Sequence, residues 1–182
     1  MVRLRHGIGG AVLAVLLGSV AHAQAPAGQP DFAGVWGYAE GGSTLRLQSD
    51  GPAIEGRLVQ PSATMKGAGM APGTLAFRGR ADGRSFEGER LVSYGDPTLL
   101  KRLRESCNVA AVWVPVRGTL SADNKTINLV YPAYLLVRDG AACQVHVPHR
   151  DGERYQQWLA RGQSSWVASQ TREAAGLLVK RP

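Results

Sequence analysis

The stretch LRLQSDGPAIEGRL, residues 45–58, decides the fold of this chain. On both sides of Asp50-Gly51, apolar residues alternate with polar ones, which is the period of a β-strand with one buried face. Aspartate followed by glycine tolerates the positive φ angles that a tight hairpin turn requires. The stretch therefore predicts two antiparallel strands joined by a turn.

The same pattern occurs twice more along the chain. Residues 75–88 alternate around Asp82-Gly83, and residues 120–131 alternate around Asp123-Asn124. In each of the three units an apolar residue stands four positions after the turn aspartate: Ile54, Phe86 and Ile127. In the first two units Glu-Gly follows, and a glycine there indicates a bulge or bend. Curled amphipathic hairpins in series predict an all-β antiparallel domain, either a small barrel or a barrel-like sandwich.

Other segments predict loops and helices. Residues 65–73 form a glycine-rich loop in this interpretation. Residues 96–104 predict a short basic helix, with Asp96 as its cap and Pro97 in its first turn. Apolar strands are expected at 109–116, 134–137 and 143–147. The C-terminal segment is expected to be partly helical, with Tyr155, Trp158 and Trp166 packing outside the barrel. Residues 170–179 are interpreted as a second helical piece.

Residues 1–23 have the composition of an export signal. Arg3 and Arg5 precede a small and apolar run at 7–20, and Ala21-His22-Ala23 has the small-x-small pattern that signal peptidase cleaves. The run is too short for a membrane-spanning helix. We expect a mature chain that begins near Gln24, with a flexible leader to residue 31 and one domain at 32–182, located in the periplasm or outside the cell.

The cysteines and the net charge bear on the redox environment and on the partners of this protein. Cys107 and Cys143 are the two cysteines of the sequence, and in an exported protein they predict one disulfide. The alternative is that Cys107 is a free nucleophile. The net charge is +7, two charges of which belong to the export signal, and the basic residues are scattered among acids. This distribution argues against a nucleic-acid partner.

The segment Phe32-Ala33-Gly34-Val35-Trp36 carries a family resemblance. A Gly-x-Trp that opens the first strand, followed by an alternating hairpin, resembles the lipocalins and avidins of the calycin superfamily. The likeness covers residues 32–59 and continues through Gly42-Ser43-Thr44. It implies a β-barrel in which Trp36 plugs one end and Gly34 permits close backbone packing, with Ser43 as a pocket-lining hydroxyl. Within such a barrel we expect the ligand to contact Ser43, Trp113 and Tyr131.

The first functional hypothesis is therefore a non-catalytic binding protein. It would hold a small apolar or amphipathic ligand in or at the mouth of the barrel. No cofactor, metal or catalytic residue is predicted. Asp50, Asp82 and Asp123 are explained by their turns, since an aspartate side chain bonds its own backbone there.

Two alternatives stay open. The helix residues Lys101, Arg102 and Arg104 would bind an anionic envelope component or a partner protein, although a solvated helix face also explains them. An uncharacterised hydrolase would use His146 or His149 as its base. The cluster of residues 146–151 is interpreted as a surface loop in preference to a metal site.

Overall fold

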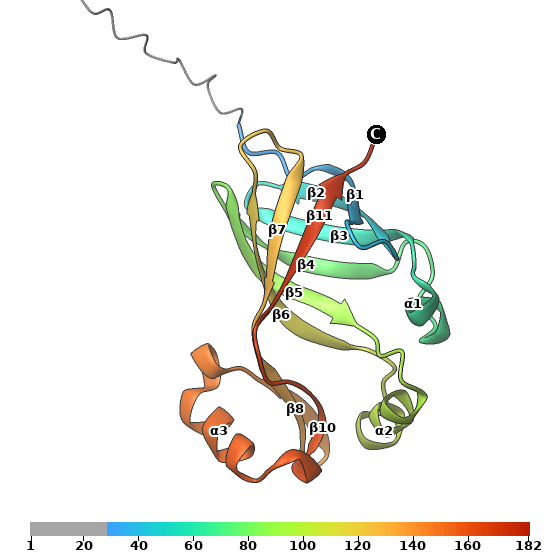
Figure 1. Ribbon diagram of the computed structural model, residues 1–182, viewed down its shortest axis with the longest axis vertical. Coiled ribbons are helices and arrows are strands. Elements are labelled where there is room, and N and C mark those ends of the chain that lie inside the picture. Colours follow the sequence, from blue (N-terminus) through green and yellow to red (C-terminus); the bar gives the residue numbers. More distant parts are fainter. Residues whose placement is uncertain (1–28) are drawn as a thin grey trace, which may run out of the picture.

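The computed structural model describes residues 29–182, and a closed antiparallel β-barrel is its main feature (Figure 1). Around the barrel the strands follow the order β1 (Gly34–Tyr38), β11 (Ala174–Lys180), β7 (Thr126–Tyr131), β6 (Val112–Leu120), β5 (Ser85–Val92), β4 (Leu75–Asp82), β3 (Ala53–Gln60) and β2 (Thr44–Asp50). The prediction of an all-β barrel is confirmed. The export signal expected at 1–23 and most of the expected leader lie outside the described residues.

The three predicted hairpins are the pairs β2–β3, β4–β5 and β6–β7. Their turns contain Gly51, Gly83 and Asn124, whose φ angles are +54°, +55° and +57°. These are the positive angles that the Asp-Gly and Asp-Asn pairs predict. Each turn therefore forms where the sequence placed it.

The two predicted bends differ in kind. At Gly56 the pairing of β3 with β4 shifts register, which is a bulge. At Gly88 the register continues, but Gly88 faces Gly79 across the β4–β5 pair, and a Cβ on Gly79 would lie 2.9 Å from Gly88 Cα. Two glycines thus let the backbones approach closely at this bend.

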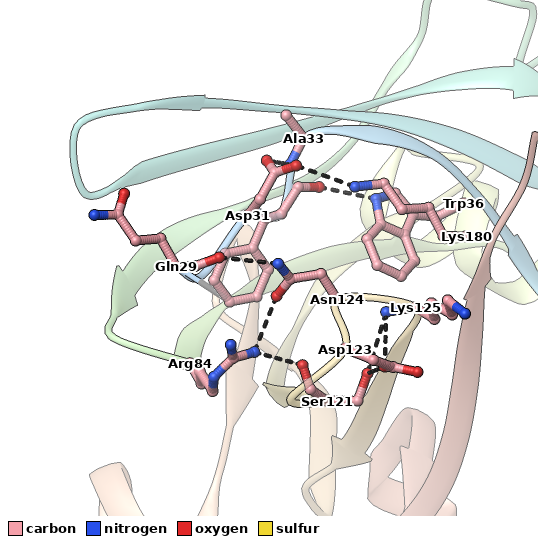
Figure 2. Close-up of polar contacts among 11 residues, drawn as sticks. Gln29, Asp31, Ala33, Trp36, Arg84, Ser121, Asp123, Asn124, Lys125 and Lys180 are labelled. Carbon is pink, nitrogen blue, oxygen red and sulfur yellow. Dashed lines mark hydrogen bonds and ion pairs between the residues drawn. The ribbon is translucent and has the colours of Figure 1, made fainter. Parts of the chain in front are cut away.

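Trp36 closes the end of the barrel where the hairpin turns lie. Its side chain is fully buried, and its Nε1 donates a hydrogen bond to Phe32 O at 2.8 Å. The Lys180 ammonium lies 5.4 Å from the centre of the indole ring and pairs with Asp31 at 3.1 Å (Figure 2). Nearby, Asn124 Nδ2 donates to Gln29 O at 2.9 Å, which ties the N-terminal segment to the β6–β7 turn.

A three-stranded sheet lies beside the other end of the barrel (Figure 1). In it, β8 (Tyr134–Asp139) runs between β10 (Trp166–Gln170) and β9 (Ala142–His146). One face packs against α2 (Pro97–Cys107) and the lower part of β6, and the opposite face packs against α3 (Pro148–Ala160). A short 3-10 turn, Gln163–Ser165, leads from α3 into β10. Strands near 134 and 143 were predicted, but not their separation into a second sheet.

One prediction at the segment level is wrong, and another is wrong only for residues 65–67. Residues 170–179 were expected to be helical, yet β11 pairs with β1 and β7 and buries Leu178 completely in the barrel core. This pairing overrides the helical preference of an alanine- and leucine-rich segment. The expected loop at 65–73 begins inside a short helix, α1 (Ala63–Gly67), because the Ser62 side chain caps the amide of Met65.

The C-terminal segment packs outside the barrel only in part. Tyr155 on α3 and Trp166 on β10 are buried against the second sheet, together with Leu135 and Val137. Trp158 packs at the margin of the same cluster. The final strand β11, in contrast, belongs to the barrel wall.

Cys107 and Cys143 form the predicted disulfide, with Cα atoms 5.5 Å apart. It joins the C-terminal end of α2 to β9, and it is consistent with an oxidising, exported location. Its formation leaves no free Cys107 nucleophile. Of the helices in residues 29–182, none combines the length and hydropathy needed to cross a bilayer.

Candidate functional site

The barrel has one sealed end and one end with a rim of connections. The hairpin turns and Trp36 lie at the sealed end. The other end is bordered by the β1–β2 loop, by α1 and by the loop from β5 to α2, and the second sheet lies beside it (Figure 1). Each of the two loops approaches the α1 segment. A Cβ on Gly95 would lie 3.4 Å from Thr64 Oγ1, and a Cβ on Gly42 would lie 3.8 Å from Ser62 Cβ. We call this rimmed end the mouth.

Arg90 points into the barrel near the mouth. On β5 it shares the inward face with Phe86, because side chains two residues apart lie on the same side of a strand. Its neighbours across the sheet are Phe77 and Val114, and both are buried. The guanidinium Cζ lies 3.7 Å from the centre of the Tyr131 ring, which is a close cation–π contact. An arginine is thus inserted among aromatic and aliphatic side chains.

This arginine has no protein counter-ion within residues 29–182. Its Nε is buried without a hydrogen-bond partner, and no carboxylate of the described chain forms an ion pair with it. The residue as a whole is partly exposed, so solvent reaches the rest of the side chain. Removing a charged group from water without a partner opposes folding, which makes this position unusual.

The ring of Tyr131 stacks on the guanidinium, and the charge of Arg90 also acts on Tyr94 and Tyr134. The hydroxyl of Tyr94 lies 2.7 Å from that of Tyr134, at hydrogen-bond distance. Burial raises the pKa values of Tyr94, Tyr131 and Tyr134, and the positive charge of Arg90 acts in the opposite direction on all three. All three hydroxyls therefore keep their protons at neutral pH and can donate hydrogen bonds. Together they form, with Arg90, what we call the arginine–tyrosine cluster.

The structure brings two of the three predicted ligand residues to the mouth. Tyr131 is 8% exposed and belongs to the arginine–tyrosine cluster. Ser43 is buried in the β1–β2 loop at the rim, and its carbonyl accepts a hydrogen bond from the Tyr38 amide at 3.4 Å. Whether either contacts a ligand stays a prediction.

Trp113 does not line the barrel interior. On β6 its neighbours Val112 and Val114 are buried and face inward, so Trp113 faces the outer surface. There the Arg78 guanidinium stacks on its ring at 4.5 Å. The prediction that Trp113 contacts a ligand inside the barrel is therefore wrong, because its position on β6 directs the side chain outward.

A groove of about 830 Å³ lies on the outer surface, between β4–β6 and the start of α3. Charges of both signs line it, including Arg80, Glu87 and Arg117. Several are already paired, since Arg117 lies 3.2 Å from Glu173 and Arg150 lies 3.1 Å from Asp151. The groove therefore offers no single excess charge to a ligand.

The two candidate histidines lie in different surroundings. His146 is 3% exposed, both of its ring nitrogens lack hydrogen-bond partners, and its ring stacks on Trp158. Its Nδ1 lies 3.8 Å from Asp151 Oδ2, which is beyond hydrogen-bond reach. His149 lines the outer groove, and in residues 29–182 no hydroxyl or carboxylate hydrogen-bonds to it. Neither histidine has the paired partner that a general base uses.

The basic helix forms as predicted. Asp96 caps α2 by accepting a hydrogen bond from the Thr98 amide at 2.8 Å, and Pro97 is its first residue. The three basic residues are exposed on this helix: Lys101, Arg102 and Arg104. Lys101 lies 3.7 Å from Glu105, and Leu103 faces the core. Their role as a contact for an anionic partner stays a prediction.

Metal chemistry has no cluster to support it in the described residues. No group of three or more His, Cys, Asp or Glu side chains comes together between residues 29 and 182 in a way that could hold an ion. Of the family models, curated proteins and solved structures compared with this chain, none matches it.

Proposed function

We propose that this protein is an exported, non-catalytic binding protein that holds a small amphipathic ligand at the mouth of its barrel. The observation that carries the proposal is Arg90. It is a partly exposed cation that lies on the ring of Tyr131, inside an apolar wall, without a carboxylate partner in the described chain. A ligand that supplies the missing hydrogen-bond acceptor would offset the cost of placing a charge there.

The filled interior supports binding at the mouth and not deep inside the barrel. Between Arg90 and the sealed end, side chains occupy the core, and Trp36, Phe77 and Phe86 are each at most 3% exposed. Edge-to-face contacts join Phe86 to Phe77 and to Phe32, with ring centres 5.0 Å and 5.8 Å apart. A ligand tail would have to displace this packing to enter further.

The rim offers apolar side chains that adapt to a ligand. Met65 on α1 and Met70 just after it pack against the barrel core. Methionine is unbranched and flexible, so such side chains rearrange around apolar groups of different shape. A polar centre with a flexible apolar border suits an amphipathic molecule.

An exported location is part of the same proposal. The Cys107–Cys143 disulfide supports an oxidising compartment, and the composition of residues 1–23 supports signal-directed export. We place the protein in the periplasm or outside the cell, where a carrier of small molecules needs no energy source to bind its ligand.

Native mass spectrometry of protein released gently from its producing cells tests this function. We expect a bound molecule of small mass on the protein, and we expect its loss in Arg90→Met. The matched control is Arg80→Gln, which removes an exposed arginine from the outer face of β4. Protein that carries no small molecule, and that takes up no amphipathic fluorescent probe when purified, would contradict the proposal.

A further inference from the structure

We infer that the ligand is a monocarboxylate, with its carboxylate on Arg90 and its apolar part directed out toward the rim. This inference rests on the proposed function, because it names the chemical class bound at the same mouth. It follows from the single positive charge of Arg90, from the planar shape of its guanidinium, and from the filled barrel interior behind it.

The number of charges favours a single negative charge on the ligand. Arg90 brings one positive charge and is the one cation that acts on Tyr94, Tyr131 and Tyr134. On Tyr131 the Glu40 carboxylate acts more weakly and with the opposite sign. The other cation with inward strand parity, Lys180, lies at the sealed end and is paired with Asp31. A phosphate dianion would retain an uncompensated charge in these apolar surroundings, whereas a carboxylate would be neutralised.

The shape of the donor group favours a planar acceptor. A guanidinium is flat, and one of its faces rests on the Tyr131 ring at 3.7 Å. Its edge then remains for a ligand, and the parallel N–H groups on that edge match the two oxygens of a carboxylate. Lysine would offer a point charge without this match.

The tyrosine pair adds a second kind of donor. Within the Tyr94–Tyr134 pair, 2.7 Å apart, one hydroxyl donates to the other. The accepting hydroxyl keeps its own proton, which is free to hydrogen-bond an outside acceptor. A tyrosine hydroxyl is protonated at neutral pH, and burial raises the pKa of both groups further, so this donor persists. A carboxylate, with about four lone-pair positions, can accept from Arg90 and from this hydroxyl together.

The closed interior sets the orientation of the ligand. Phe77, directly across the strand pair from Arg90, is 1% exposed and part of the continuous core. The carboxylate therefore leads inward to Arg90, and the tail runs outward toward the rim, where α1 carries Met65. Aliphatic and aromatic carboxylates both satisfy this arrangement.

Titration calorimetry at pH 7 with decanoate and 1-decanol, which share a tail and differ in the head group, tests the inference. We expect decanoate to bind the wild type more tightly than 1-decanol does. Loss of charge-assisted hydrogen bonds in Arg90→Met should weaken decanoate binding by about tenfold to a hundredfold, with little change for 1-decanol. Arg90→Lys should fall between, and Arg80→Gln should match the wild type.

The possible results separate the two proposals. Equal binding of decanoate and 1-decanol that is insensitive to Arg90→Met would overturn the carboxylate assignment and leave mouth binding intact. Displacement of decanoate by millimolar inorganic phosphate, but not by acetate, would also overturn it in favour of phosphate. Binding of neither probe to the wild type would overturn the proposed function itself. Methionine is apolar and about as long as the aliphatic stem of arginine, so Arg90→Met should fold, and its near-UV circular dichroism verifies this.

Discussion

Gly118→Ala tests how tightly the barrel core is packed. Gly118 lies on the inward face of β6, and the ring of Phe86 covers it. A Cβ at this position would lie 2.6 Å from Phe86 Cζ and 3.0 Å from Cδ1, well inside ordinary carbon–carbon contact. The ring cannot swing away freely, because it also packs edge-on against Phe77 and Phe32. Overpacking of this kind costs about 1–3 kcal/mol, and we expect the upper part of that range.

Urea unfolding followed by circular dichroism measures the effect. The matched control is Gly67→Ala, because Gly67 has no atom near its would-be Cβ and lies at the end of α1. We expect the control to change the free energy of unfolding by less than about 0.5 kcal/mol. The pair Gly118→Ala with Phe86→Leu should lose less than the two single changes together, since the smaller side chain makes room for the methyl group. Gly118→Ala with wild-type stability would refute the packing that we describe.

Three other perturbations address the disulfide, the partly exposed carboxylate of Asp151 and the basic helix. Replacing both Cys107 and Cys143 by serine should lower the free energy of unfolding by about 4 kcal/mol, from the entropy of a loop with sequence separation 36, and denaturant curves with and without reductant check this. For Asp151, burial opposes ionisation, but hydrogen bonds from Arg150 and the Val147 amide hold the pKa below its ordinary 3.8. The ionised Asp151 carboxylate should stabilise the fold fully above about pH 5 and lose this effect as the pH falls through its lowered pKa. The difference in free energy of unfolding between wild type and Asp151→Asn should therefore close in acid. A difference that stays constant with pH would contradict this. If Lys101, Arg102 and Arg104 bind an anionic envelope component, replacing all three by glutamate should abolish association with anionic vesicles at low salt. The affinity for decanoate should not change. Unaltered association with the vesicles would remove this alternative.

Much of the barrel could be predicted because its hairpins are local. Alternation fixes which residues face inward, and the turn residues fix where each strand reverses. The second sheet could not be predicted as a separate body, since periodicity does not say with which strand another pairs. Its central strand β8 buries Tyr134 to Val137 on both faces, which hides the alternation. For β11, pairing with distant strands outweighed local helical preference.

Only part of the candidate site could be predicted from the sequence. Tyr131 follows Ile127 and Leu129 at even spacing, so its inward direction could be predicted. Trp113 lies in the apolar run 109–116, where no polar residue marks the parity, and it faces outward. Arg90 was missed because a charged residue on a strand is ordinarily solvated. Its even spacing from Phe86 was the signal that placed it inside.

The chain holds its unpaired arginine at one particular place, and that place explains how the fold tolerates it. Nearer the sealed end, a guanidinium among Trp36 and its neighbours would lose all contact with water. Beyond the rim, it would be an ordinary solvated charge without selectivity. At the mouth, the ring of Tyr131 covers one face of Arg90 while the partial exposure of the side chain keeps a route to solvent open. The free protein can thus hydrate the group, and a ligand can replace that water with a matched acceptor, which is the condition for binding that is both reversible and selective.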